Sequence, residues 1–235
     1  PPAHAQRAFR FGPTVGTTLS TAHFDDVSYV NVLPANVNYS RRWGFLAGAT
    51  GSYQSKGHWG GQVAVLYTQQ GYRQPYSYGA YQSETNVRLN YLRVPLQATF
   101  SQHAGGQGLQ AFAGPYVGVL LGGHRAFEST TAGSTYAHDE RIVVAESRTR
   151  ALFSSYDYSA PDSASYSRRF DVGVQAGVGY RLGNALLQVG YTLGLRNLAT
   201  TTVYTSGTGS YSDAGVPYRT RGWQVSLTYL LGPKS

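Results

Sequence analysis

The residues with the most reactive side chains are six histidines and the serines and carboxylates near some of them. No two histidines stand four residues apart with a nearby glutamate, which is the spacing of a helix-borne zinc site. One segment combines all parts of a hydrolase triad, with His124, His138, Asp139, Glu140 and Ser147. A lipid hydrolase could be built from such residues, because a triad is defined by geometry and not by order. No nucleophile-elbow motif accompanies them, so we expect no catalytic, cofactor-binding or metal-ligating residue.

The composition excludes several classes of protein. The chain has 235 residues and no cysteine, which excludes disulfides, thiolate metal sites and a cysteine nucleophile. The formal net charge of +8 comes from 17 arginines and 2 lysines. The arginines are scattered, whereas nucleic-acid-binding proteins concentrate basic residues in a stripe, so we expect no nucleic-acid partner. Phosphate-bearing headgroups, such as those of outer-membrane lipid and lipopolysaccharide, would suit the charge at least as well.

The positions of the apolar residues follow a period of two. In residues 184–198, with the sequence NALLQVGYTLGLRNL, Leu187 and Val189 alternate with glutamine and glycine. This period is typical of a β-strand with one apolar face and one small or polar face. The alternation recurs, and we predict eight strands at residues 9–19, 43–53, 61–72, 86–100, 108–123, 170–182, 184–198 and 222–231. A slip in phase near Tyr91 and Leu92 predicts a β-bulge there.

The connections between these strands alternate in length. Short connections are predicted at residues 54–57, 101–107 and 182–184, and long ones at residues 20–42, 73–86, 124–168 and 199–218. Short turns at one end and long loops at the other are the pattern of bacterial outer-membrane barrels. We therefore predict an all-β fold, an eight-stranded antiparallel up-and-down transmembrane β-barrel with short periplasmic turns and long extracellular loops.

The two faces of each strand indicate which side of the barrel meets lipid. A soluble barrel exposes a face rich in charged residues, but the polar face here is mainly glycine, glutamine, threonine and serine. The apolar face carries valine, leucine, alanine and phenylalanine, with tyrosine and tryptophan toward the strand ends, as in a lipid-facing band with aromatic girdles. We predict a protein of the bacterial outer membrane, with Leu193 and Val225 near the middle of the bilayer.

The polar face must then fill the interior, because eight strands enclose a lumen only wide enough for side chains. We predict a structural lumen network of Arg10, Arg93, Asp171, Gln175, Arg181, Gln188, Arg196 and Gln224. Asp171 is the clear acid among them, and an unpaired buried carboxylate would be costly. Its expected partners are Arg93 and Arg196.

Four strand motifs resemble the PorT-type outer-membrane β-barrel family, also described as outer-membrane protein β-barrel domains. The segments YLRVPLQATF and VLYTQQGYR are similar to its Tyr-Leu-Glu-Ile-Pro-Leu strand and its Leu-Tyr-Ser-Gln-Gln-Gly strand end. The segments FDVGVQAGVGYRL and VGYTLGLRNL are similar to its Phe-Asp-x-Gly…Gly-x-Gly-Tyr and Tyr-x-x-Gly-Leu-x-Asn-Ile strands. The resemblance implies an eight-stranded outer-membrane barrel, generally without an assigned enzymatic activity, and tied in some members to a secretion apparatus. Arg93 and Ala64 stand where the family usually has glutamate, so no binding residue is carried over.

The N-terminal residues 1–5 end in the small-x-small pattern of a signal-peptidase site, so we expect a signal-peptide tail there and one barrel domain over residues 6–235. We expect a non-enzymatic, porin-like barrel with a plugged lumen. It would act through its extracellular loops or with other envelope proteins in an envelope or secretion complex. Two alternatives stay open, a lipid A- or phospholipid-modifying enzyme and a narrow small-solute channel. An inward-facing acid–histidine pair at the outer rim would favour the enzyme, and an unblocked lumen the channel.

Overall fold

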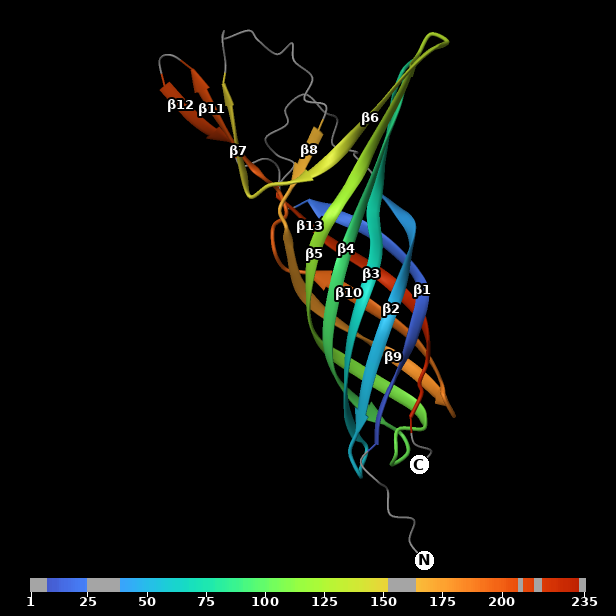
Figure 1. Cartoon of the computed structure of the whole chain (residues 1–235). Coiled ribbons are helices and arrows are strands. Elements are labelled where there is room, and N and C mark those ends of the chain that lie inside the picture. The colour runs from blue at the N-terminus through green and yellow to red at the C-terminus, as the bar shows by residue number, and fades with distance from the viewer. Residues whose placement is uncertain (1–7, 25–38, 152–163, 207–208, 214–216, 233–235) are drawn as a thin grey trace, which may run out of the picture.

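The computed structural model contains eight strands that close into an antiparallel ring (Figure 1). The structure describes residues 8–24, 39–151, 164–206, 209–213 and 217–232, so the expected signal-peptide tail lies outside the described residues. The ring strands are β1 (Ala8–Phe24), β2 (Ser40–Gln54), β3 (Trp59–Tyr78), β4 (Tyr81–Ser101), β5 (Gly108–Thr131), β9 (Phe170–Leu182), β10 (Ala185–Gly194) and β13 (Tyr218–Tyr229). Each pairs with the next, and β13 returns to pair with β1. The described part of the chain holds no helix of the length and apolarity that crossing a membrane requires.

All eight predicted strands are present, and the predicted short turns lie at residues 55–58, 102–107 and 183–184. These turns share one end of the barrel with the start of β1 and the end of β13 (Figure 1). The predicted fold class is therefore confirmed. The strands can be recognised in the sequence because a tilted strand needs about 9–11 alternating residues to cross a bilayer.

At the opposite end, two predicted long loops contain regular strands among their described residues. The segments predicted as connections at 73–86 and 124–168 contain the ends of β3, β4 and β5 and the strand β6 (Ser134–Val144). Residues 72–78, 81–87, 125–131 and 134–140 of these strands pair side by side and rise beyond the ring (Figure 1). We call these four segments the extracellular sheet. The remaining short strands are β7 (Ser147–Ala151), β8 (Ala164–Ser167), β11 (Thr201–Ser206) and β12 (Gly209–Asp213).

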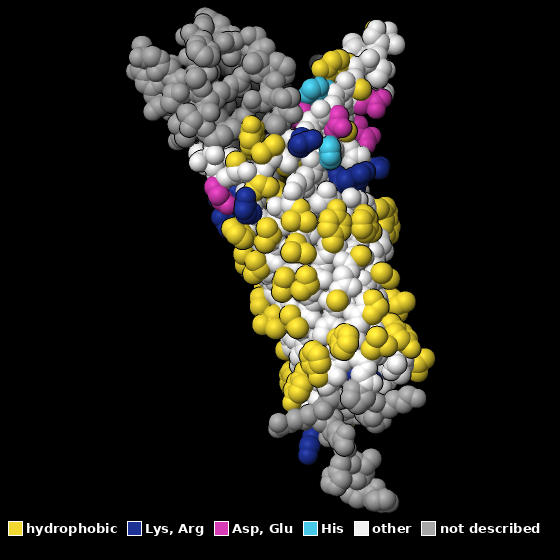
Figure 2. Space-filling model, viewed as in Figure 1, with side chains coloured by type: hydrophobic (Ala, Val, Ile, Leu, Met, Phe, Trp, Pro, Cys, Tyr) yellow, Lys and Arg dark blue, Asp and Glu magenta, His cyan; other side chains and the backbone are white. Residues whose placement is uncertain are grey.

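The burial of side chains shows which face meets lipid. On β13, Trp223, Val225 and Leu227 are exposed by 39–50%, whereas the residues that alternate with them are buried. The same pattern on the other ring strands produces an apolar band around the barrel wall (Figure 2). The apolar residues thus cover the outside of the barrel and the polar residues fill its inside. This arrangement is stable only when lipid surrounds the wall.

The strand register indicates that Leu193 lies nearer the outer edge of the apolar band than the sequence pattern predicts. Leu193 pairs with Arg221, whereas the adjacent outward row below it contains the paired aromatic residues Tyr191 and Trp223. Aromatic rows mark the edges of the hydrocarbon, so Leu193 lies at the outer interface. Val225 lies one further outward row down the wall, below Trp223, inside the apolar band.

The predicted bulge lies in the pairing of β4 with β5, where the register shifts between Asn90 and Tyr91. The extra residue is on β5, however, because Asn90 pairs with Gly122 and Tyr91 with Leu120, leaving Leu121 between them. The burial pattern of β4 alternates without interruption. The slip in the hydrophobic pattern of β4 has another cause. Its inward residues are apolar near the extracellular end, at Leu89 and Tyr91, and polar further along, at Arg93 and Gln97.

Candidate functional site

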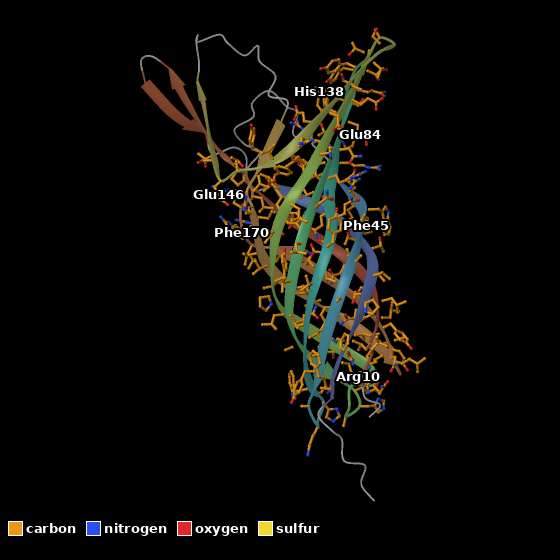
Figure 3. The ribbon with its side chains drawn as sticks, in the orientation of Figure 1. Arg10, Phe45, Glu84, His138, Glu146 and Phe170 are labelled. Carbon is orange, nitrogen blue, oxygen red and sulfur yellow. The ribbon has the colours of Figure 1, made fainter. Side chains whose placement is uncertain are left out.

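The lumen contains all of the predicted network residues except Arg196. Each is less than a tenth exposed, and the set comprises Arg10, Arg93, Asp171, Gln175, Arg181, Gln188 and Gln224. Arg10 lies near the turn end of the barrel (Figure 3). The strand alternation is sufficient to place these residues inward, because the residues on either side of each one face lipid.

Asp171 is the centre of the most densely connected part of the lumen. Its Oδ2 accepts hydrogen bonds from the Thr220 hydroxyl at 2.9 Å, the Tyr116 hydroxyl at 3.3 Å and an Arg93 guanidinium nitrogen at 3.4 Å. The Arg93 guanidinium also lies 4.1 Å from the centre of the Tyr116 ring. Asp171 and Arg93 are both fully buried, so each charge depends on the other for compensation. The strand pattern indicated Arg93, but it gave no signal for Tyr116 or Thr220.

The placement of Arg196 in the lumen is wrong, and so is its predicted contact with Asp171. The strand β10 ends at Gly194, so the two-residue alternation does not extend to Arg196. The Arg196 side chain is 36% exposed and lies 3.1 Å from a carboxylate oxygen of Glu146. Arg168 approaches the same carboxylate at 4.0 Å. This ion-pair cluster lies at the outer rim, where Figure 3 labels Glu146.

Polar side chains also bridge the walls at other levels of the lumen. Gln188 on β10 donates a hydrogen bond to Gln62 on β3, 3.0 Å away. These strands stand opposite each other in the ring, so the contact crosses the lumen. Thr14 joins Thr50 and Thr228 by hydroxyl hydrogen bonds of 2.6 and 2.8 Å.

The extracellular end of the lumen is apolar, which the sequence pattern did not predict. A buried cluster there comprises Val87, Leu89, Tyr91, Leu120 and Ile142. Phe24 stacks on Tyr39 at 4.2 Å between ring centres, and Tyr218 and Tyr72 contact Phe24 at 5.5 and 5.6 Å. Burial raises the pKa of the Tyr39 phenol above its ordinary value. The aromatic contacts cover the polar lumen from the extracellular side.

The candidate triad residues of the 124–168 segment do not form a triad. His124 lies 3.8 Å from Asp139, and His138 lies 3.5 Å from Glu140. Among the described residues, neither imidazole has a hydrogen bond to a serine or threonine hydroxyl, and Ser147 starts a different strand. No group of three or more described His, Cys, Asp or Glu side chains is placed to hold a metal ion.

A family model described as "Outer membrane protein beta-barrel domain" matches residues 4–200 of the chain. The chain belongs to this family. Its localisation is the bacterial outer membrane, in agreement with the apolar wall. No curated protein matches the chain.

Solved structures similar to this outer-membrane barrel include two bacterial proteins. One is Ail, the attachment invasion locus protein of Yersinia pestis, in complex with the heparin analogue sucrose octasulfate. It is 11% identical over 96% of this chain and 100% of that chain, with a TM-score of 0.40. The other is Neisserial surface protein A, which is 12% identical over 93% of this chain and 96% of that chain, with a TM-score of 0.40.

Proposed function

We propose that this outer-membrane barrel is non-enzymatic and recognises an extracellular ligand through one face of the extracellular sheet. The observation that carries the proposal is a row of paired residues that crosses all four strands. Tyr76 pairs with Ser83, Ser83 with Ser129, and Ser129 with Tyr136. Directly paired residues share a face of a sheet, so both tyrosines lie on the same surface.

Further aromatic side chains extend this surface. Tyr81 contacts Tyr76 edge-on at 6.0 Å, and His138 stacks with Tyr136 at 6.4 Å. Phe127 pairs with His138 in the next row. Tyr136 is 60% exposed although it is a large aromatic residue. Tyr76 and Tyr81 are half-buried. Tyrosines on a paired sheet support binding, because they offer a large contact area and a hydroxyl at little cost in conformational entropy.

The opposite face of the extracellular sheet has a different character. It carries Glu84, Glu128 and Asp139, and Glu84 also lies 3.9 Å from Arg73. Figure 3 shows Glu84 and His138 beyond the barrel wall. Such a charged face favours contact with water, so the aromatic face is the better candidate for the binding surface.

The test is a comparison of two variants of the full-length barrel in lipid nanodiscs, probed with glycan and peptide arrays. We expect the wild-type protein to bind a defined class of glycan or peptide, and Y76S together with Y136S to abolish that binding. E84S on the opposite face is the matched control and should bind normally. Binding that survives the tyrosine substitutions, or the absence of any array ligand, would count against the proposal.

An enzymatic function is less well supported. His138 and Glu140 do form an acid–histidine pair beyond the rim, on the face that continues the inner side of the barrel wall, which is the arrangement that would favour an enzyme. A hydrolase also needs a nucleophile within hydrogen-bonding reach of its base. The described residues place no hydroxyl there, so we assign the pair to the binding surface.

We also propose a narrower kinship with PorT-type barrels and a contact with other envelope proteins. The four strand motifs support this kinship. Three of them lie within ring strands, and VGYTLGLRNL begins on β10 and continues beyond its end at Gly194. The family usually has glutamate at the position of Arg93. Here Arg93 pairs with Asp171, so the ion pairs inside this barrel differ from those of the family. Copurification from native membranes should identify an envelope complex, and recovery of the barrel alone would argue against one.

A further inference from the structure

A hollow on the outer wall lies where the apolar band ends. It has a volume of about 520 Å³ and is lined by residues that include Leu19, Thr21, Arg41, Arg221 and Trp223. These residues come from β1, β2 and β13, which are neighbours in the ring. The hollow is therefore built on adjacent strands of the barrel wall.

The register places an aromatic floor under a pair of cations. Trp223 pairs with both Tyr191 and Leu19, and its ring contacts Tyr191 edge-on at 5.1 Å. Arg221 pairs with Thr21, one outward row above Trp223. Two residues along a strand correspond to roughly 7 Å, so the guanidinium group stands just beyond the aromatic row that marks the edge of the hydrocarbon. On the face that Figure 2 shows, Lys and Arg side chains stand above the apolar band together with acidic and histidine side chains.

Within the described residues, no acidic side chain compensates the charge in this hollow. Arg41 and Arg221 make no ion pair or side-chain hydrogen bond with another residue in the described part of the chain, and no acid lines the hollow. Some other arginines of the rim are paired. Arg125 lies 3.6 Å from Glu140, and Arg196 and Arg168 share a carboxylate. The hollow is thus a cationic part of the rim at which no described acid lies.

We propose that this hollow binds a phosphate-bearing lipid of the outer leaflet. Arg41 and Arg221 would hold the headgroup phosphate from two sides, because guanidinium groups donate strong charge-assisted hydrogen bonds to phosphate oxygens. The acyl chains would lie on the apolar stripe of Trp223, Val225 and Leu227 below. The occupant is a lipid and not a free anion, because the cations stand directly above a continuous apolar wall.

Native mass spectrometry of the full-length barrel, released from micelles that contain diphosphorylated lipid A, tests this site. We expect bound lipid A on the wild-type protein and a loss of affinity of at least about tenfold in R41Q/R221Q, since two charge-assisted contacts are removed. R41K/R221K keeps both charges and should retain most of the binding. R88Q is the matched control, because Arg88 is an exposed rim arginine on β4, outside the hollow.

Two competitors distinguish the source of the phosphate. Fully dephosphorylated lipid A should not bind, and millimolar inorganic phosphate should not displace the lipid. Equal binding of the dephosphorylated lipid, or displacement by phosphate alone, would overturn the proposal. So would an equal loss in R88Q, which would indicate a diffuse attraction to the whole rim. The shift of electrophoretic mobility on heating must show that each variant is folded before it is compared.

Discussion

Gln188 on β10 and Gln62 on β3 form a hydrogen bond of 3.0 Å straight across the barrel lumen. These strands are four positions apart in a ring of eight, which is the largest separation that the ring allows. A side-chain contact between opposite walls means that the lumen is filled at this level. The Asp171 layer and the apolar extracellular cluster provide two further obstructions along the same path.

We therefore predict that the purified protein forms no stable ohmic channel in planar bilayers. Q62A/Q188A should also be closed, because the paired Arg93 and Asp171 remain in place. Single-channel recording checks both, with a large porin as the positive control for insertion. Reproducible conductance steps from homogeneous wild-type protein would instead support the small-solute channel.

Arginine substitutions at two depths of the wall should have unequal effects. V225R places a charge inside the apolar band and should lower the free energy of unfolding by about 2–4 kcal/mol, whereas L193R at the outer interface should cost only about 0–1 kcal/mol. Urea titration of the barrel folded in lipid vesicles measures both. Equal costs would mean that the assigned depth of Leu193 is wrong.

The strand pattern was sufficient to predict the ring, and its failures have physical causes. Alternation is enforced wherever lipid meets one face and the lumen the other, so all eight ring strands could be found. The extracellular sheet meets water on its charged face, and its rows of tyrosine, serine and threonine resemble a polar loop. Residues 73–86 therefore lack the alternation of apolar residues, although they pair regularly as parts of β3 and β4.

Phe112 provides a test of packing in the lumen. Its ring lies beside Gly177 and Gly190, and a Cβ added at Gly190 would come within 2.8 Å of the Phe112 ring. We predict that G190A lowers the free energy of unfolding by about 1–3 kcal/mol through overpacking. F112L/G190A should recover part of that loss, because leucine leaves room for the added methyl group. Additive effects of the two substitutions in urea titrations would show that the residues do not interact.

The composition of the lumen was predictable only in part. The alternation of apolar and polar residues placed Arg93 and Asp171 inside the barrel. Because an isolated buried charge is costly, the two side chains were expected to lie close together. The same reasoning failed for Arg196, since it assumed that β10 continues beyond Gly194. The two-residue alternation does not show where a strand ends. Arg196 lies beyond the end of β10, and its side chain contacts Glu146 at the rim.

Asp171 gives the sharpest test of what the lumen is for. D171N preserves the size of the side chain but removes its charge, so Arg93 is left as an uncompensated buried cation. We predict a loss of about 3–5 kcal/mol in the free energy of unfolding. R196Q should cost less than about 1 kcal/mol, because its ion pair is partly exposed. Urea titration followed by tryptophan fluorescence measures both variants.

The paired substitution R93M/D171L separates a structural role from a catalytic one. Removing both charges leaves no unpaired ion, so this variant should be much more stable than D171N. If Asp171 is structural, ligand binding by the extracellular sheet should be unchanged in R93M/D171L, since that surface lies outside the barrel. Phospholipid and lipid A hydrolysis assays complete the comparison. A D171N protein of unchanged stability that has lost a measurable acyl-hydrolase activity would make Asp171 catalytic and the non-enzymatic proposal wrong.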